Sequence, residues 1–240
     1  MVFSSENNKL KNRLGILGGM GPKASEVLYR WITDRTDASC DQDHIPIVII
    51  SDTQMPDRTE SILSGNTSGI YSQLLSDCRQ LEACGCACIA IACNTSHYFV
   101  ENLQKEVEIP IFNMPARTVE RLADSGKKKV AVLATDGTLK TGIYTRELEK
   151  RGISYYRPEG EIQAAVMSII YDDIKEGKPG SMETWQKIEA AIRREGCDSA
   201  ILGCTELSVF RENYDLPDFY LDAMEVLVDD CLNFFGKAKA

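Results

Sequence analysis

The sequence lacks any long apolar segment and any cluster of basic residues. No stretch approaches the ~18 consecutive apolar residues that cross a bilayer, and the opening residues 1–13 are polar, without the apolar core of a signal peptide. The 36 acidic residues outnumber the 27 basic ones, which gives a formal net charge of -9. This balance disfavours nucleic acid and anionic membranes as partners. We therefore expect a cytoplasmic protein that binds neither a membrane nor nucleic acid.

Histidine and tryptophan are scarce, at two residues each, whereas cysteine occurs nine times. An odd number of cysteines cannot all pair within one chain, so we expect free thiols in a reducing compartment, most of them packed as small apolar side chains. Cys84, Cys86 and Cys88 form a C-x-C-x-C pattern that matches no common metal or iron–sulfur spacing. Alternation at the entry of a strand explains them better, and we expect no metal site.

Short apolar runs alternate with amphipathic segments along the chain, which at 240 residues and 43% hydrophobic content can bury a full core. This alternation predicts an α/β fold whose parallel sheets carry helices on their faces. Loops are expected at 54–59 and 135–138. The expected strands are 14–17, 45–50, 88–92, 109–113, 130–134, 153–156, 199–202 and 219–221, and the main expected helices are 22–36, 69–83, a segment ending near 124, a segment from about 141, 162–175, 182–195 and 223–235.

The second half of the chain repeats the pattern of the first. Any two strand–helix segments share glycine turns, but three matched sets in the same order favour a duplication over that simpler explanation. We expect two pseudo-symmetric, doubly wound α/β domains, residues 1–112 with about 210–240 and residues about 113–209, and a ligand in the cleft between them. The matched sets are Leu14, Leu17 and Gly21 with Val130, Leu133 and Gly137 (offset 116), Gly85, Cys86 and Cys93 with Gly196, Cys197 and Cys204 (offset 111), and Pro110, Phe112 and Ala116 with Pro217, Phe219 and Ala223 (offset 107).

Each half contains a cysteine directly after a buried strand and before a helix start: Cys93 in ACNTSH (92–97) and Cys204 in GCTEL (203–207). Open α/β sheets bind their ligands at such strand ends. Moving an α-proton from one face of a carbon to the other requires a group on each side, and two symmetry-related thiols supply that geometry. A helix N-terminus can lower the pKa of a thiol. Core packing is the alternative, but the duplicated position and the polar neighbours favour catalysis.

Three segments together, GILGGMGP (15–22), ACNTSH (92–97) and LGCTEL (202–207), resemble the aspartate/glutamate racemase family. The resemblance covers nearly the whole chain, and the CNT and GCT pair is its specific part. It implies interconversion of the L and D forms of aspartate or glutamate by two bases, without pyridoxal phosphate or another cofactor. It also implies two pseudo-symmetric domains, a small acidic amino acid as the ligand, and a homodimer.

The same resemblance assigns the catalytic roles to Cys93 and Cys204. In the aspartate-type branch, an arginine and a lysine that correspond to Arg58 and Lys175 hold the side-chain carboxylate of the substrate, although a lone arginine or lysine is more often a surface charge. The substrate-binding residues implied are Met20, Gly21, Arg58, Asn94, Thr95, Thr135, Thr138, Lys175 and Thr205.

Three further polar residues keep two interpretations each. Glu206 stands where the glutamate racemases have a histidine, and it would raise the pKa of Cys204 if it pointed inward, so the identity of the resting thiolate stays open. His97 either orients groups near Cys93 or completes a helix start. Asp52 follows a strand and fits a turn or cap.

Other functions remain open. Related enzymes of the superfamily are isomerases or decarboxylases of other dicarboxylates. Gly19-x-Gly21-x-x-Ala24 after a strand imitates the fingerprint of a dinucleotide-binding oxidoreductase, although Asp52 lies further on than the usual ~20 residues. A third possibility is a non-catalytic, two-lobed acidic amino-acid binder. Aspartate and glutamate differ by one methylene, which is worth only ~1 to 3 kcal/mol in a pocket and leaves no motif.

Overall fold

A computed structural model describes residues 12–238 of the chain and contains two parallel β-sheets. The first sheet has the order β2-β1-β3, and the second has the order β5-β4-β6-β7. All of the strand pairs are parallel, as predicted. The strands are β1 (Arg13–Gly18), β2 (Ile47–Ser51), β3 (Cys86–Ile91), β4 (Lys129–Leu133), β5 (Ser154–Tyr156), β6 (Ser199–Leu202) and β7 (Tyr220–Asp222).

The two sheets share one strand order, since β1, β2 and β3 occupy the places that β4, β5 and β6 occupy in the second sheet. The expected strand at 109–113 forms only a single parallel bridge, between Ile89 and Ile111. That bridge takes the place of β7: the Ile89 N–H donates to the Pro110 carbonyl, just as the Ala200 N–H donates to the Phe219 carbonyl. A shared strand order, with similar hydrogen bonds at the corresponding edge of each sheet, is the arrangement that a duplicated chain produces.

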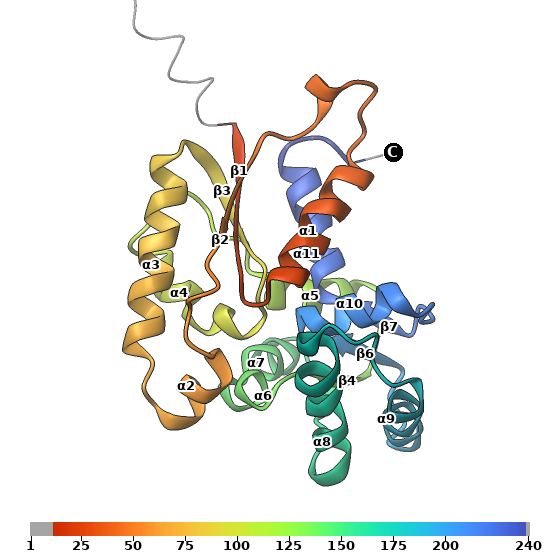
Figure 1. Ribbon diagram of the computed structural model, residues 1–240. Helices are drawn as coiled ribbons and strands as arrows, with labels where there is room; N and C mark the ends of the chain where they lie inside the picture. The colour runs from red at the N-terminus through yellow and green to blue at the C-terminus, as the bar shows by residue number, and fades with distance from the viewer. Residues whose placement is uncertain (1–11, 239–240) are drawn as a thin grey trace, which may run out of the picture.

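Helices cover both faces of each sheet (Figure 1). On the first sheet, α3 packs on one face, and α1 and α11 lie together on the other. The helices are α1 (Pro22–Arg35), α2 (Arg58–Ser64), α3 (Ser68–Ala83), α4 (Val100–Leu103), α5 (Met114–Asp124), α6 (Asp136–Thr141), α7 (Ile143–Lys150), α8 (Gly160–Ser168), α9 (Met182–Arg194), α10 (Thr205–Asn213) and α11 (Ala223–Phe234). The predicted apolar stripe of the first helix is confirmed, because Val27, Leu28, Trp31 and Ile32 are all buried.

Besides the strand at 109–113, three predictions of local structure were wrong. Each of these three segments lies beside the strand ends. The loop expected at 54–59 leads at Arg58 into α2, a seven-residue helix that starts because the Asp57 side chain accepts from the Glu60 N–H at 2.8 Å. The loop expected at 135–138 is the start of α6, capped by Thr135. The helix expected at 162–175 is broken by a π-helical turn, Ile169–Asp173, and by a 3₁₀ turn, Ile174–Glu176. Such irregular turns are frequent at functional sites.

The expected domain boundaries stay a prediction, with one qualification from the sheet pairing. The first domain was expected to include residues from about 210 onward, yet β7 is hydrogen-bonded to β6 in the second sheet. The helix that follows, α11, packs against α1 and α5. One continuous cluster of buried side chains extends through both halves, from Leu14 and Ile16 in β1 to Ile201 and Leu202 in β6. Within residues 12–238, no helix is both long and apolar enough to span a membrane.

All nine cysteines are free thiols. In the C-x-C-x-C segment, Cys84 is exposed while Cys86 and Cys88 are buried on β3. Burial raises the pKa of Cys86 to about 11 and that of Cys88 to about 12, so both remain protonated and pack as small apolar side chains. The described residues contain no group of three or more potential ligands arranged to hold a metal ion.

A buried carboxyl at the start of α11 makes stability depend on pH. Asp222 is fully buried and accepts from the Ser208 hydroxyl at 2.7 Å and the Met224 N–H at 2.8 Å. Burial raises its pKa to about 7, whereas an unfolded aspartate titrates near ~3.9. The protonated form therefore favours the fold, and this contribution is full at low pH and lost as the pH rises through about 7.

We expect Asp222→Asn to remove this loss, because asparagine keeps the acceptor and cannot ionise. Between pH 5 and pH 8, the free energy of unfolding of the wild type should fall by on the order of 2 kcal/mol more than that of the variant. Urea unfolding at both pH values measures the difference, with the exposed Asp218→Asn as the control. Parallel pH profiles of Asp222→Asn and the wild type would contradict the assignment.

Candidate active site

The carboxyl ends of the two sheets meet at one small cavity between the halves of the molecule. Its volume is about 10 Å³, which is room for about one water molecule. An amino acid therefore enters only when the halves move apart. The lining residues are Met20, Asp57, Arg58, Thr59, Cys93, Asn94, Thr95, Thr135, Tyr171, Lys175, Cys204, Thr205 and Glu206.

Most of the residues predicted from the sequence line this cavity, including both cysteines. Gly21 and Thr138 do not line it directly. Gly21 lies at the adjoining outer cavity, where an added Cβ would come within 3.3 Å of the Glu206 Oε1. Thr138 lies behind Thr95 and bonds to its hydroxyl. The residues of the lining that the sequence analysis missed are Asp57, Thr59 and Tyr171.

Cys204 is held as a thiol by Glu206. The cysteine is 5% exposed, follows β6 at the start of α10, and its Sγ donates to Glu206 Oε2 at 2.9 Å. Burial raises the pKa of Cys204 well above its usual value, and the charge of Glu206 and the hydrogen bond to it raise that pKa further. The expectation that an inward Glu206 would raise this pKa is confirmed.

Cys93 has a cation rather than a carboxylate as its neighbour. It follows β3 and is 5% exposed. Burial lowers the pKa of Arg58, but the adjacent Cys93 and the nearby Asp57 outweigh burial and raise it. The Arg58 guanidinium therefore stays charged beside Cys93. Cys204, by contrast, has the Glu206 carboxylate bonded to it and the Lys175 ammonium nearby, so the charged neighbours of the two cysteines differ.

Arg58 also holds two loops of the site together. Its Nη1 donates to the carbonyls of Met55 at 3.3 Å and Pro56 at 3.0 Å, and its Nη2 donates to the Met20 carbonyl at 2.9 Å. The Nε of this buried side chain has no partner. Arg58 is thus a buried residue that anchors the loops, not a surface charge, and it keeps one N–H donor for a ligand.

Lys175 lies on the broken helix after α8 and forms an ion pair with Glu206, at 3.4 Å between Nζ and Oε1. Its Nζ also lies 5.0 Å from the centre of the Tyr171 ring. Burial lowers the pKa of Lys175, but Glu206 and Cys204 raise it by more, so the ammonium group stays charged. The sequence alone left this lysine as either a ligand or a solvated charge, and the structure places it on the cavity wall.

Three threonine hydroxyls meet where the two halves join. Thr95 Oγ1, from the first half, lies 2.8 Å from Thr138 Oγ1 and 3.3 Å from Thr135 Oγ1, which both belong to α6 or its cap. Thr135 and Thr138 lie 3.1 Å apart. A hydroxyl can donate to or accept from a ligand. This cluster is therefore suited to a carboxylate bound across the two halves.

Asn94 is oriented by a residue that sequence reasoning missed. The Tyr144 hydroxyl, on α7, donates to Asn94 Oδ1, which leaves the buried Nδ2 without a partner. A tyrosine fifty positions away carries no local signal of this contact. The bond fixes the amide so that its donor end is available in the cavity that Asn94 lines.

His97 and Asp52 have structural roles. Burial lowers the pKa of His97 to about 4, so the ring is neutral, and its Nδ1 lies 2.8 Å from the Cys93 carbonyl. It supports the turn that presents Cys93. Asp52 accepts from the Gln54 N–H at 2.9 Å, which confirms the turn interpretation.

The glycine loop after β1 packs against protein on both sides. Gly19 has a φ of 89°, and a Cβ there would lie 2.4 Å from the backbone of Asp52, so only glycine fits. Its N–H donates to the Ser25 hydroxyl at 2.9 Å. The next turn of the loop faces the Glu206 carboxylate beside Gly21. Because the Gly19 N–H is already bonded to Ser25, it is not free to donate to a pyrophosphate, which disfavours the dinucleotide-binding alternative.

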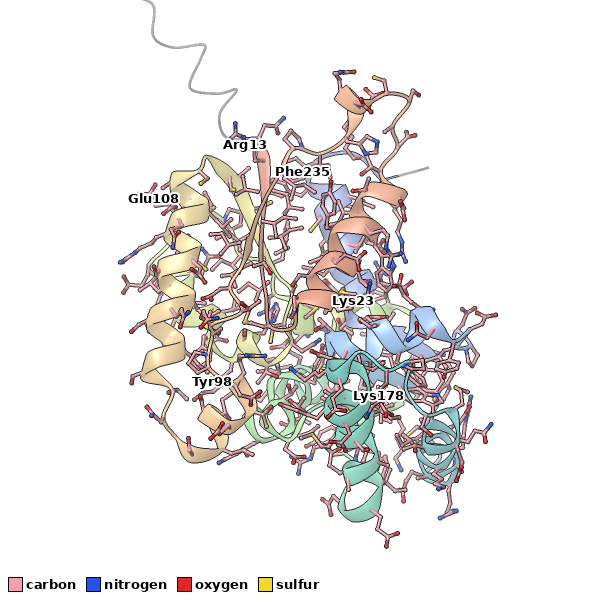
Figure 2. The ribbon with its side chains drawn as sticks, viewed as in Figure 1. Arg13, Lys23, Tyr98, Glu108, Lys178 and Phe235 are labelled. Carbon is pink, nitrogen blue, oxygen red and sulfur yellow. The ribbon has the colours of Figure 1, made fainter. Side chains whose placement is uncertain are left out.

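An outer cavity of about 690 Å³ adjoins the closed one and shares Arg58, Lys175 and Glu206 with it. Lys23, at the start of α1, and Lys178, just before α9, also line it. Figure 2 shows both lysines where α1 approaches the broken helix of the second half. Lys23 pairs with Glu26 at 2.6 Å and Lys178 pairs with Glu176 at 2.6 Å, so each of these two cations has a carboxylate partner beside the entrance.

Two hydrogen bonds join the halves in addition to those of the threonine cluster and of Tyr144 with Asn94. The Tyr171 hydroxyl donates to Asp57 Oδ2 at 3.2 Å, and Lys140 Nζ donates to the Leu63 carbonyl at the end of α2, at 3.0 Å. Both bonds join the first half to the second. They must break or lengthen when the cavity opens.

Comparisons with known proteins identify the family and the fold of the chain. The family profile described as Asp/Glu/Hydantoin racemase matches residues 17–231. Among solved structures, the aspartate racemase of Picrophilus torridus is 32% identical and superposes with a TM-score of 0.79, over 95% of this chain and 96% of that one. The broad specificity amino-acid racemase RacX of Bacillus subtilis is 26% identical over 81% of this chain and 86% of its own. A glutamate racemase of Aquifex pyrophilus is 31% identical, over 52% of this chain and 48% of its own. The family profile thus matches most of a chain whose duplicated α/β fold carries a cysteine at equivalent strand ends. The protein belongs to the Asp/Glu/hydantoin racemase family of amino-acid racemases.

Proposed function

We propose that this protein interconverts L- and D-aspartate, glutamate or both by proton transfer at Cα between Cys93 and Cys204, without a cofactor. The observation that carries the proposal is the single cavity that joins both cysteines to Arg58 and Lys175. Two thiols suit the exchange of an α-proton, and two cations suit a substrate with a second carboxylate. The relatives, an aspartate racemase, a glutamate racemase and a broad specificity amino-acid racemase, support the same reaction class.

The unequal surroundings of the cysteines assign their starting roles. Cys93, beside the Arg58 guanidinium, is the base that takes the α-proton first, and Cys204, bonded to Glu206, is the acid. The Cys93 sulfur takes the α-proton as the C–H bond breaks, and the electron pair of that bond spreads into the α-carboxylate. Cys204 then gives its S–H proton to the opposite face, and the pair returns to form the new C–H bond. The reverse reaction exchanges these roles.

The remaining polar groups of the cavity hold the substrate. The hydroxyls of Thr95 and Thr135 and the free Nδ2 of Asn94 bind the α-carboxylate and amino groups, and the donors stabilise the charge that develops on that carboxylate. Thr205 is the counterpart of Asn94 in the second half and lines the same cavity. Arg58 and Lys175 bind the side-chain carboxylate. Closure of the halves excludes water from this assembly, which strengthens each charged contact.

The test incubates the purified protein with L-aspartate and, separately, with L-glutamate in deuterium oxide without added cofactor. Proton NMR follows the loss of the α-proton signal, and chiral chromatography follows the D product. We expect α-deuteration together with the D enantiomer for at least one of the two. Binding of either amino acid with no exchange would indicate a binder instead, and saturation by added NAD would favour the oxidoreductase. Exchange with another dicarboxylate alone would favour a related isomerase or decarboxylase.

We also propose that the protein acts in the cytoplasm as a homodimer. The nine free thiols support a reducing compartment. The resemblance to the aspartate/glutamate racemases supports the dimer, as does the outer edge of β2, where Ile47 and Val48 are half-buried and Ile49 is exposed. Sedimentation velocity measures the assembly directly, and a monomer at micromolar concentration would contradict it.

A further inference from the structure

Glu206 connects a catalytic cysteine to the entrance of the site. Its Oε2 accepts from Cys204, whereas its Oε1 has no hydrogen-bond partner and faces Lys175 and the Gly21 turn. The residue lines both the closed cavity and the outer cavity of about 690 Å³. One carboxylate thus touches the sulfur on one side and the route to solvent on the other.

A two-base reaction leaves the enzyme in the wrong protonation state after each turnover. When Cys93 abstracts and Cys204 donates, Cys93 ends as a thiol and Cys204 ends as a thiolate. The next turnover in the same direction requires Cys204 to regain a proton from solvent. Because Cys204 is only 5% exposed, that proton needs a carrier.

We propose that Glu206 is the proton relay that reloads Cys204 from the solvent of the outer cavity. The inference rests on the proposed racemase function. In the reloading step, the Glu206 carboxylate first takes a proton from water or from a buffer acid in the outer cavity. It then gives this O–H proton to the Cys204 sulfur, so that an S–H bond forms as the O–H bond breaks and the carboxylate is restored. Glu206 acts through Cys204 and is therefore a positioning and relay residue.

The charges around Glu206 suit this role. Lys175 lies 3.4 Å from Oε1, and the Arg58 guanidinium is close enough for electrostatic attraction. These two cations lie beside the carboxylate that accepts the hydrogen bond of the Cys204 thiol. Cys93 has no carboxylate among its recorded hydrogen-bond partners within residues 12–238, so the relay serves only one of the two thiols. The second half of the site is in this respect not a copy of the first.

The test compares Glu206→Gln with the wild type and with Glu176→Gln, an exposed carboxylate that pairs with Lys178 near the outer cavity. Glutamine keeps an oxygen that accepts the Cys204 hydrogen bond but cannot carry a proton. A slower reload follows product release, so kcat and KM should fall together by about tenfold or more while kcat/KM changes little. The kcat of Glu206→Gln should also rise with buffer concentration, because a small acid replaces the relay. Glu176→Gln should match the wild type.

Other outcomes overturn the relay. A parallel fall in kcat and kcat/KM would place Glu206 in the chemical step, and unchanged kinetics without buffer dependence would remove it from the reaction. An independent measurement follows alkylation of Cys204 in a Cys93→Ala background as a function of pH. Glu206→Gln should shift the alkylation profile to lower pH, and an unshifted profile overturns the proposal whatever the activity is. A wild type that exchanges no α-proton would instead defeat the proposed function, so the two failures are distinguishable.

Discussion

Cys93→Ala and Cys204→Ala should each lower the rate of racemisation by on the order of 10³-fold or more, because each removes the only acid or base on one face of the substrate carbon. Both side chains line the same cavity, and neither makes a bond that the fold depends on. The loss should therefore appear in kcat/KM with little change in melting temperature. Chiral chromatography of the products measures the effect.

The half-reactions separate the two roles more sharply. If Cys93 is the base for one enantiomer, Cys204→Ala should still exchange the α-proton of that enantiomer with deuterium oxide, while Cys93→Ala should exchange it far more slowly. Cys84→Ala is the matched control, since Cys84 is an exposed thiol on the same domain and should leave the rate unchanged. Full racemisation by either cavity variant would contradict the two-base assignment.

Arg58→Ala should weaken catalysis on dicarboxylates far more than on alanine or serine. A hydrogen bond to a charged group is worth ~1.5 to 3 kcal/mol, which corresponds to roughly a 10- to 150-fold loss in kcat/KM for aspartate. Because Arg58 also donates to three backbone carbonyls, the variant should unfold at a lower temperature as well. The substrate ratio separates the two effects, since loop disorder penalises every amino acid.

Lys175→Met provides the comparison for Arg58→Ala, because the recorded contacts of Lys175 are with side chains only, Glu206 and Tyr171. It should reduce turnover of aspartate selectively without a comparable loss of thermal stability. The two variants are compared through kcat/KM for aspartate and through the α-deuteration rate of alanine. Equal losses for both substrates in Arg58→Ala would show that this arginine does not bind the side-chain carboxylate.

The positions of most strands and of the two cysteines followed from local pattern. Apolar runs of four to six residues predicted most of the strands because buried parallel strands exclude polar side chains from both faces. The repeated offsets predicted a duplication, and the structure adds the strand order that the two sheets share. The strand at 109–113 was overpredicted, since a single bridge leaves too little pairing for a regular strand.

The periodicity of apolar residues could not predict the short capped helices and the irregular turns. The seven residues of α2 begin at a cap and end at Gly65, which is too short a segment for an apolar stripe to show. The π-helical turn at Ile169–Asp173 interrupts an otherwise continuous helical pattern. Within this turn, the Tyr171 hydroxyl donates to Asp57 in the opposite half. No local sequence pattern indicates that contact.

The sequence by itself determined that two cysteines sit at equivalent strand ends, because a duplicated strand–helix unit places its polar residues at the same edge of each sheet. Only the tertiary structure decided that the two thiols differ. Arg58 reaches Cys93 from a helix start thirty-five positions earlier, while Glu206 turns back onto Cys204 and pairs with Lys175 from another helix. Electrostatic environment depends on distance in space, so a pattern along the chain cannot contain it, and the folded arrangement alone sets the charged neighbours of each cysteine.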